Sequence, residues 1–309
     1  MTDRVRITDV APRDGLQAEP GVVETARKAE LVRRIRSTGV DEIEVSSFVS
    51  PKWIPQLGDA RELFAAIAPD PAAGVVYSAL VPNERGLDAA LETNRDAREA
   101  HGVERLIDKI SVFTSATEGF ARANTNATIA ETLERFRPIV PRAHEHGLMV
   151  RAYISCVVRC PYDGDVSPAQ VGDVASRLLE LGADEIDLGD TIGAATPDTL
   201  EQVILEVIDR LGGEPINRFG DPALTLHLHD TFGTAHACAA RSLELGVRSF
   251  DASAGGLGGC PYASSEGRRA PGNIATGTLL DAIEAAGLTH ALDRAALDAA
   301  SDAARGLIA

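Results

Sequence analysis

Two histidines separated by one residue are the first sign of chemistry in this sequence. His227 and His229 stand in an alternating apolar run, residues 224–233, whose period of two predicts a β-strand. Side chains two apart project from the same face of a strand, so both imidazoles are placed to bind one metal ion. A bare His-x-His motif is about as often a pair of structural histidines with polar neighbours. The turn and helix start at residues 230–233 favour the metal, because active-site groups collect at the carboxyl ends of barrel strands.

Further polar side chains stand at or near the ends of other predicted strands. Arg13, Asp14 and Gln17 follow the first strand and combine a cation, a carboxylate and an amide; a surface ion pair in an Asp-Gly turn is the alternative interpretation. Glu44 lies inside an apolar strand, where an unpaired carboxylate is rare, so we expect it to orient another polar group. Asp190 contacts the substrate or caps the next segment, and capping is the simpler interpretation.

A glycine-rich segment, residues 255–259, precedes Cys260. Its glycines let the backbone approach a ligand closely, but the segment lacks both the Walker lysine and the G-x-G-x-x-G order of nucleotide sites. A cysteine in such a polar setting is a candidate reactive thiol. Cys238, on an alanine-rich segment, is expected in the core, and Cys156 and Cys160 lack the second pair that a zinc site needs. Four cysteines are too few for a disulfide framework, so we expect reduced thiols.

Short β-branched runs alternate with longer segments of helical period along the whole chain. This pattern predicts an α/β protein with a parallel sheet, and repeated phrases ending a helix at glycine before a strand, at residues 37–45 and 181–188, favour a (β/α)₈ barrel. We expect a single domain over residues 1–309 with an extra C-terminal helix from residue 292. Predicted strands cover residues 5–9, 42–47, 75–81, 108–113, 149–155, 185–189, 223–229 and 248–252, and predicted helices include 24–37, 129–146, 168–181 and 197–211.

The composition and net charge limit the classes of binding partner that we expect. Thirty basic and 46 acidic residues among 309 give a net charge of −16, which argues against nucleic acid or an anionic membrane as the main partner. A hydrophobic content of 44% suffices for a large core. The sequence lacks an apolar run of about 18 residues and opens on a strand-like segment, so we expect neither a membrane span nor a signal peptide, and a cytoplasmic location.

Five segments, in this order and spacing, resemble the 3-hydroxy-3-methylglutaryl-CoA lyase family. They are residues 12–17, 47–56, 188–193, 227–233 and 255–262, and the resemblance extends over residues 5–288. The Arg-Asp and His-x-His parts are shared with the wider superfamily of metal-dependent aldol and Claisen enzymes. The resemblance implies a pyruvate-carboxyltransferase-like TIM-barrel catalytic domain that cleaves a 3-hydroxyacyl-CoA between C2 and C3. For the type substrate the products are acetyl-CoA and acetoacetate.

The resemblance also implies a divalent metal held by Asp14, His227, His229 and Asn273. Imidazole, carboxylate and amide ligands without thiolate suit Mg²⁺ or Mn²⁺ better than a zinc-only site. Such an ion would chelate the substrate 3-hydroxyl and lower its pKa. Beyond the metal, the expected catalytic residues are Arg13 for the enolate oxyanion, Cys260 as proton donor, Asp190, and Asp9 as a relay. The expected substrate-binding residues are Arg13, Gln17, Glu44 and Ser47.

Three departures from the family pattern concern the substrate. Asp9 and Gly277 stand where the family usually has glutamate, and Ala18 where it has asparagine. A roomier, less acidic pocket would favour a related ester such as citramalyl-CoA. Arg268 and Arg269, in a longer loop, could contact a substrate carboxylate or a CoA phosphate, or be solvated.

Two other classes of protein are alternatives. A Claisen condensing synthase shares the metal chemistry, but usually carries a further C-terminal domain. A non-catalytic CoA-ester binding protein would have no use for four metal ligands and a loop cysteine. We therefore expect an enzyme with an acyl-CoA substrate, which assembles as a homo-oligomer.

Overall fold

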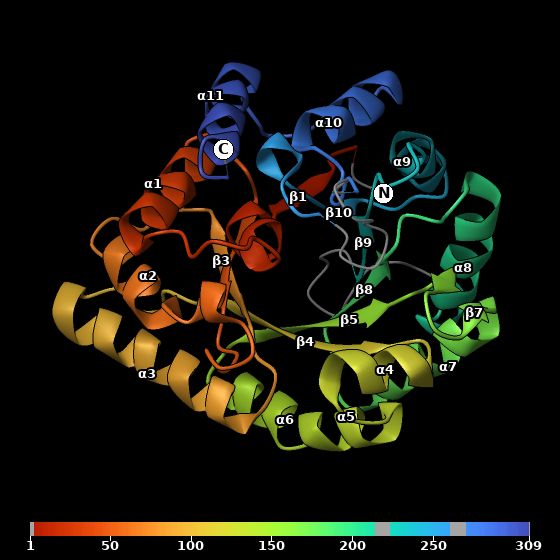
Figure 1. The fold of residues 1–309 in the computed structure, drawn as a ribbon, viewed down its shortest axis with the longest axis horizontal. Coiled ribbons are helices and arrows are strands. Elements are labelled where there is room, and N and C mark those ends of the chain that lie inside the picture. Colours follow the sequence, from red (N-terminus) through yellow and green to blue (C-terminus); the bar gives the residue numbers. More distant parts are fainter. Residues whose placement is uncertain (1–2, 214–222, 260–269, 309) are drawn as a thin grey trace.

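The structure, a computed structural model, describes residues 3–213, 223–259 and 270–308. Its centre is a closed barrel of parallel strands in the order β1-β10-β9-β8-β5-β4-β3-β2, and helices surround it (Figure 1). This confirms the predicted (β/α)₈ barrel. The eight barrel strands are β1 (Arg6–Asp9), β2 (Glu42–Ser47), β3 (Val76–Leu80), β4 (Lys109–Ser115), β5 (Met149–Ser155), β8 (Glu185–Asp190), β9 (Leu224–Leu228) and β10 (Ser249–Ala252).

Several of the surrounding helices begin at a residue whose side chain caps the first turn. Helix α7, for example, starts after Ser167, whose hydroxyl accepts the N–H of Gln170 while the Gln170 side chain accepts the N–H of Ser167 at 3.0 Å. The α-helices are α1 (Thr25–Arg36), α2 (Ala60–Ile67), α3 (Glu84–His101), α4 (Glu118–Thr125), α5 (Ile129–Phe136), α6 (Ile139–Glu145), α7 (Pro168–Glu180), α8 (Pro197–Arg210), α9 (Ala235–Glu244), α10 (Thr276–Ala285) and α11 (Arg294–Arg305).

The single helix predicted over residues 129–146 is wrong, because two helices, α5 and α6, occupy this segment. Pro138 lies between them and immediately precedes α6. Proline has no N–H for the helical hydrogen bond, and its ring clashes with the preceding turn. The apolar period continues through the break, so the periodicity alone did not reveal it.

Some short elements were not predicted. The strands β6 (Arg159–Cys160) and β7 (Gly164–Asp165) form an antiparallel hairpin after β5. A short π-helix, η1 (Ala11–Gly15), follows β1, and a 3-10 turn, η3 (Ala254–Gly256), follows β10. Helix α11 confirms the predicted C-terminal helix and contacts η3, where Gly255 N–H donates to Ser301 Oγ at 3.1 Å. In the described residues, the helices are too short or too polar to cross a membrane.

The first and last barrel strands meet at a seam. Strand β1 pairs with β10 from Arg6↔Ser249 to Asp9↔Ala252. Asp9 Oδ1 accepts the N–H of Ala11 at 3.0 Å. Its Oδ2 accepts the N–H of Ala254 at 3.0 Å and the Thr276 hydroxyl at 3.1 Å. Burial raises the pKa of Asp9 to about 7. Asp9 thus joins β1, η3 and α10.

The amino-terminal half of the barrel interior is charged. Lys109 Nζ lies 2.6 Å from Glu42 and 2.8 Å from Glu185, and Arg151 Nη2 lies 2.9 Å from Glu185. All four side chains are buried and stand at or near the starts of their strands. The buried charges in this half of the barrel are therefore paired, which offsets the cost of removing them from water.

Candidate metal centre and catalytic cavity

The four predicted metal ligands meet at the carboxyl end of the barrel. Asp14 belongs to η1, directly after β1. His227 lies in β9 and His229 directly follows this strand, so the period of two brings both rings to one side. Asn273 forms an isolated backbone bridge with His229, which places the segment after the glycine-rich loop beside the end of β9. Residues from both ends of the chain are thereby brought together.

The distances among Asp14, His227 and His229 fit a divalent ion. His227 Nε2 lies 3.2 Å from His229 Nε2 and 3.8 Å from Asp14 Oδ2. Asn273 Nδ2 donates to the same Asp14 oxygen at 2.9 Å. Ligand atoms of Asp14, His227 and His229 all lie within 4.8 Å of one another. Two imidazole nitrogens that face each other beside a carboxylate oxygen form a donor set typical of a divalent metal site.

Burial and neighbouring charges shift the pKa values of Asp14, His227 and His229. Burial acts to raise the pKa of Asp14, but Arg13 and the two histidines lower it well below its usual range, so this carboxylate is ionised at neutral pH. Burial, and then the nearby His227, lower the pKa of His229 to about 4. Burial also lowers the pKa of His227, but its hydrogen bond to Asp251 and the charge of Asp14 raise it overall.

Arg13 is fixed between two carboxylates. Its Nε and Nη2 both contact Oε2 of Glu44, and its Nη1 lies 2.5 Å from Oδ1 of Asp14. Glu44 is completely buried in β2, so its charge requires such a partner. Glu44 is not part of the cavity lining, and its predicted contact with substrate stays a prediction. A guanidinium has five N–H groups, and these contacts engage three of them. Arg13 lines the cavity described below, so the other two can meet a ligand.

The other predicted site residues divide between the cavity and the framework. Gln17 lines the cavity. Ser47 is fully buried at the end of β2 and is not part of the lining. Asp190 accepts the backbone N–H groups of residues 194 and 195 at 3.0 and 2.9 Å, and burial raises its pKa to about 6. Asp9 lies in the seam, also outside the lining. Catalytic roles for Asp9 and Asp190 stay predictions.

Cys260, the predicted reactive thiol, lies outside the described residues. Cys156, Cys160 and Cys238 are free thiols and buried, as predicted for structural cysteines. Burial raises the pKa of Cys238 to about 12 and that of Cys156 still further. A buried thiol with a raised pKa is a poor nucleophile, so these two are inert at neutral pH.

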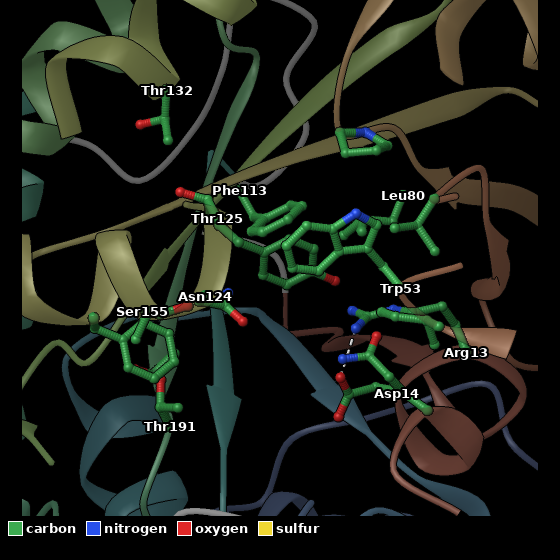
Figure 2. A pocket seen from close by; sticks show the side chains of 18 of the residues that line it. Arg13, Asp14, Trp53, Leu80, Phe113, Asn124, Thr125, Thr132, Ser155 and Thr191 are labelled. Atoms are coloured by element: carbon green, nitrogen blue, oxygen red, sulfur yellow. Dashed lines mark hydrogen bonds and ion pairs between the residues drawn. The ribbon is translucent and has the colours of Figure 1, made fainter. Parts of the chain in front are cut away.

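A cavity of about 680 Å³ extends from the candidate metal centre across the barrel mouth. Arg13 and Asp14 lie at one end of the close-up in Figure 2, and Thr125 and Thr132 lie toward the other. Trp53, with 71% of its surface exposed, lies between these two ends. The lining includes three phenylalanines, Phe113, Phe120 and Phe136, and four polar residues, Asn124, Thr125, Asn126 and Arg135. Such a mixed lining suits a ligand with both apolar and hydrogen-bonding parts.

The sequence analysis did not single out two residues that lie beside the predicted metal ligands. Asp251 Oδ2 lies 3.0 Å from Nδ1 of His227, and the Tyr153 hydroxyl lies 3.0 Å from the same oxygen. Both are buried in barrel strands, and Tyr153 also lines the cavity. Asp251 follows Phe250 in an apolar strand, the same signal that singled out Glu44. Applied to every strand, that signal would have found it.

Comparison with known proteins gives a consistent result. The model of the HMGL-like family matches residues 4–303. The 3-hydroxy-3-isohexenylglutaryl-CoA/hydroxy-methylglutaryl-CoA lyase of Pseudomonas aeruginosa is 43% identical over 280 residues, which cover 91% of this chain and 85% of that protein. The human mitochondrial hydroxymethylglutaryl-CoA lyase is 39% identical over 288 residues, covering 93% of this chain and 81% of that protein.

Solved structures agree with these relatives. The HMG-CoA lyase of Brucella melitensis superposes with a TM-score of 0.87 at 43% identity, covering 98% of each chain. An HMG-CoA lyase from Acinetobacter baumannii, solved in complex with coenzyme A and 3-methylmalate, gives a TM-score of 0.85 at 32% identity and covers 99% of this chain and 92% of that one.

Proposed function

Because this chain belongs to the HMGL-like family and is a carbon–carbon lyase of the hydroxymethylglutaryl-CoA lyase type, we propose that it cleaves 3-hydroxy-3-methylglutaryl-CoA to acetyl-CoA and acetoacetate. The observation that carries the proposal is the Asp14–His227–His229 cluster with Arg13 beside it at one end of the cavity. A structural relative with bound coenzyme A supports an acyl-CoA as the partner. A cytoplasmic location and a homo-oligomer stay predictions.

We propose Mg²⁺ or Mn²⁺ as the metal, with Asp14, His227, His229 and Asn273 as its ligands. The candidate group contains nitrogen and oxygen donors and, in the described part of the chain, no thiolate, which favours these ions over zinc. Once bound, the ion would supply Lewis acidity that lowers the pKa of the substrate 3-hydroxyl. Asp14, ionised through its neighbours, contributes the negative charge that a cation needs.

Arg13 is proposed to stabilise the charge that develops during cleavage. When a base takes the proton of the 3-hydroxyl, C3 becomes a ketone carbon and the electron pair of the C2–C3 bond moves onto the thioester as an enolate. Glu44 and Asp14 hold the guanidinium in place before this charge appears, so little reorganisation is needed. Cys260 is the proposed donor of the proton that C2 then takes, which completes acetyl-CoA.

The test is the stoichiometry of the reaction and its dependence on metal. The purified protein with Mn²⁺ should release acetyl-CoA and acetoacetate in equal amounts from 3-hydroxy-3-methylglutaryl-CoA. His229→Ala should lose bound Mn²⁺ and most turnover, because it removes one of the facing imidazoles. His236→Ala is the matched control, since this histidine is exposed on α9. Failure of the wild-type protein to cleave this ester would refute the proposal.

The cavity supports a second substrate class, 3-hydroxyglutaryl-CoA esters with a larger apolar group at C3. Phe113, Phe120 and Phe136 contribute apolar surface to the cavity lining, which suits an apolar branch. The Pseudomonas aeruginosa relative is named for a substrate with an isohexenyl group. Of the three departures noted in the sequence, Ala18 lines the cavity, while Asp9 and Gly277 are not in its lining. Measuring kcat/KM over a series of 3-alkyl esters tests this class; a steep fall beyond methyl would exclude it.

A further inference from the structure

We propose that Asp251 is a positioning residue that aims His227 at the metal and is coupled, through Tyr153 and Glu44, to Arg13. The structural unit, here called the Asp251 frame, consists of Asp251, Arg151 and Tyr153. The inference rests on the metal centre proposed above, and it assigns a role to residues outside the proposed ligand set of Asp14, His227, His229 and Asn273.

The contact between Asp251 and His227 sets the tautomer of the imidazole. An ionised carboxylate only accepts hydrogen bonds, so the 3.0 Å contact with Nδ1 places the ring hydrogen on that nitrogen. The lone pair is then on Nε2, the atom that lies near Asp14 and His229. A carboxylate behind a metal-binding histidine sets both its tautomer and its ring orientation.

Arg151 in turn fixes Asp251. Its Nη1 donates to Asp251 Oδ1 at 2.9 Å, and its Nη2 donates to Thr8 at 3.0 Å and lies 2.9 Å from Glu185. Asp251 and Arg151 are 2% and 1% exposed, so their mutual charge is scarcely screened by water. These contacts come from β1, β8 and β10 and converge on a guanidinium from β5. A planar group held from three strands has little freedom to rotate, and neither has the carboxylate it holds.

Tyr153 extends the frame to the other side of the site. Its hydroxyl lies 3.0 Å from Asp251 Oδ2 and 3.4 Å from Glu44 Oε2, the atom that holds Arg13. Its ring stands edge-on to His227 and lies 5.6 Å from the Arg13 guanidinium. One phenol therefore contacts the group that orients the metal ligand and the group that orients the oxyanion donor.

The proposed effect of Asp251 on metal binding is tested with Asp251→Asn, which keeps the size of the side chain. Its amide can still accept from one neighbour but presents an N–H₂ group to another donor. We expect Mn²⁺ affinity, measured by isothermal titration calorimetry, to fall by about 10- to 100-fold. Raising the Mn²⁺ concentration should restore a large part of the lost turnover, a rescue that a general packing defect would not give.

Asp184→Asn is the matched control. Asp184 is also a buried carboxylate bonded to a histidine, His144, at 2.8 Å, and it accepts the N–H of Val150 at 2.9 Å. It precedes β8, at the opposite end of the barrel from the metal centre. This variant should bind Mn²⁺ with wild-type affinity. The proposed coupling of Tyr153 to Arg13 is tested with Tyr153→Phe, which should lower kcat. The Mn²⁺ affinity should stay within about threefold of wild type, because the Asp251 contact to His227 is retained.

A measurement on the wild-type protein covers the case in which Asp251→Asn does not fold. In ¹⁵N-histidine protein loaded with ¹¹³Cd²⁺, coupling to cadmium should appear at the Nε2 atoms of His227 and His229. Coupling at Nδ1 of His227 would overturn the inference, as would Asp251→Asn that binds Mn²⁺ as tightly as wild type. If the wild-type protein binds no divalent ion, the proposed metal centre itself fails, and the two failures are thereby distinguished.

Discussion

Replacing Arg13 with methionine separates its catalytic contribution from its structural one. The side chain is 5% exposed and neutralises Glu44, which is completely buried. Loss of one preorganised donor to an oxyanion costs about 2.7–4 kcal/mol, a fall in kcat of about 10²- to 10³-fold. Leaving a buried carboxylate unpaired costs about 3–5 kcal/mol of folding free energy. Arg13→Met should therefore show both losses.

A second substitution tells the two losses apart. In Arg13→Met/Glu44→Gln the buried charge is gone, so the free energy of unfolding in urea should return towards the wild-type value. The kcat should remain low, because the cation is still missing. Lys28→Met is the matched control: Lys28 is equally buried and pairs with Asp59 at 2.8 Å outside the cavity, so it should lose stability but keep kcat. Recovery of kcat in the double variant would refute the oxyanion role of Arg13.

Three further predictions concern the loop thiol, the cavity wall and the seam. Cys260→Ser should lower kcat without changing Mn²⁺ affinity. Alkylation followed by peptide mapping should label Cys260 before the buried Cys238, and the reverse order of labelling would contradict the role of Cys260 as proton donor. Ala18→Asn should lower kcat/KM for bulky 3-alkyl esters relative to the methyl ester by about 1–3 kcal/mol, whereas Gly277→Glu, placed where an added Cβ meets open space, should not. Asp9 has a pKa of about 7 in the folded protein and a much lower pKa when unfolded, so the folded state binds an extra proton between these values. The wild-type free energy of unfolding in urea should therefore rise as pH falls from 8 towards 5, and Asp9→Asn should lack this rise. Identical pH profiles of the two proteins would exclude the effect.

The sequence predicted those parts of the fold that depend on local periodicity. Each barrel strand was expected within a few residues of its observed position, because β-branched runs and alternation report on a strand directly. The helix break at Pro138 escaped prediction, since the apolar period runs on across it. The hairpin of β6 and β7 has two-residue strands, too short for any period to show.

The candidate site was predictable where type and spacing report on chemistry. His227 and His229 share a face of one strand, so local sequence sufficed to propose them as metal ligands. Asp14 follows another strand end, which marked it as a candidate site residue, but Asp14 and Asn273 were proposed as ligands only through the family resemblance. The contacts of Asp251 with Arg151 and Tyr153 join strands far apart in the sequence, and no local pattern specifies such partners. The same limit applies to Gly277, whose place outside the cavity lining depends on how α10 packs.

The seam between β1 and β10 has a consequence for how the chain folds. Strand β1 leaves the ribosome before the other barrel strands, yet its partner in the seam begins at residue 249. Until then Asp9 lacks the N–H of Ala254 and the hydroxyl of Thr276, and one edge of β1 stays unpaired. Pairing across such a sequence separation is entropically costly and slow. Pulsed hydrogen exchange during refolding should therefore find the amides of β1 and β10 protected after those of β4 and β5, and the nascent barrel must keep an open edge away from other chains until its last strand arrives.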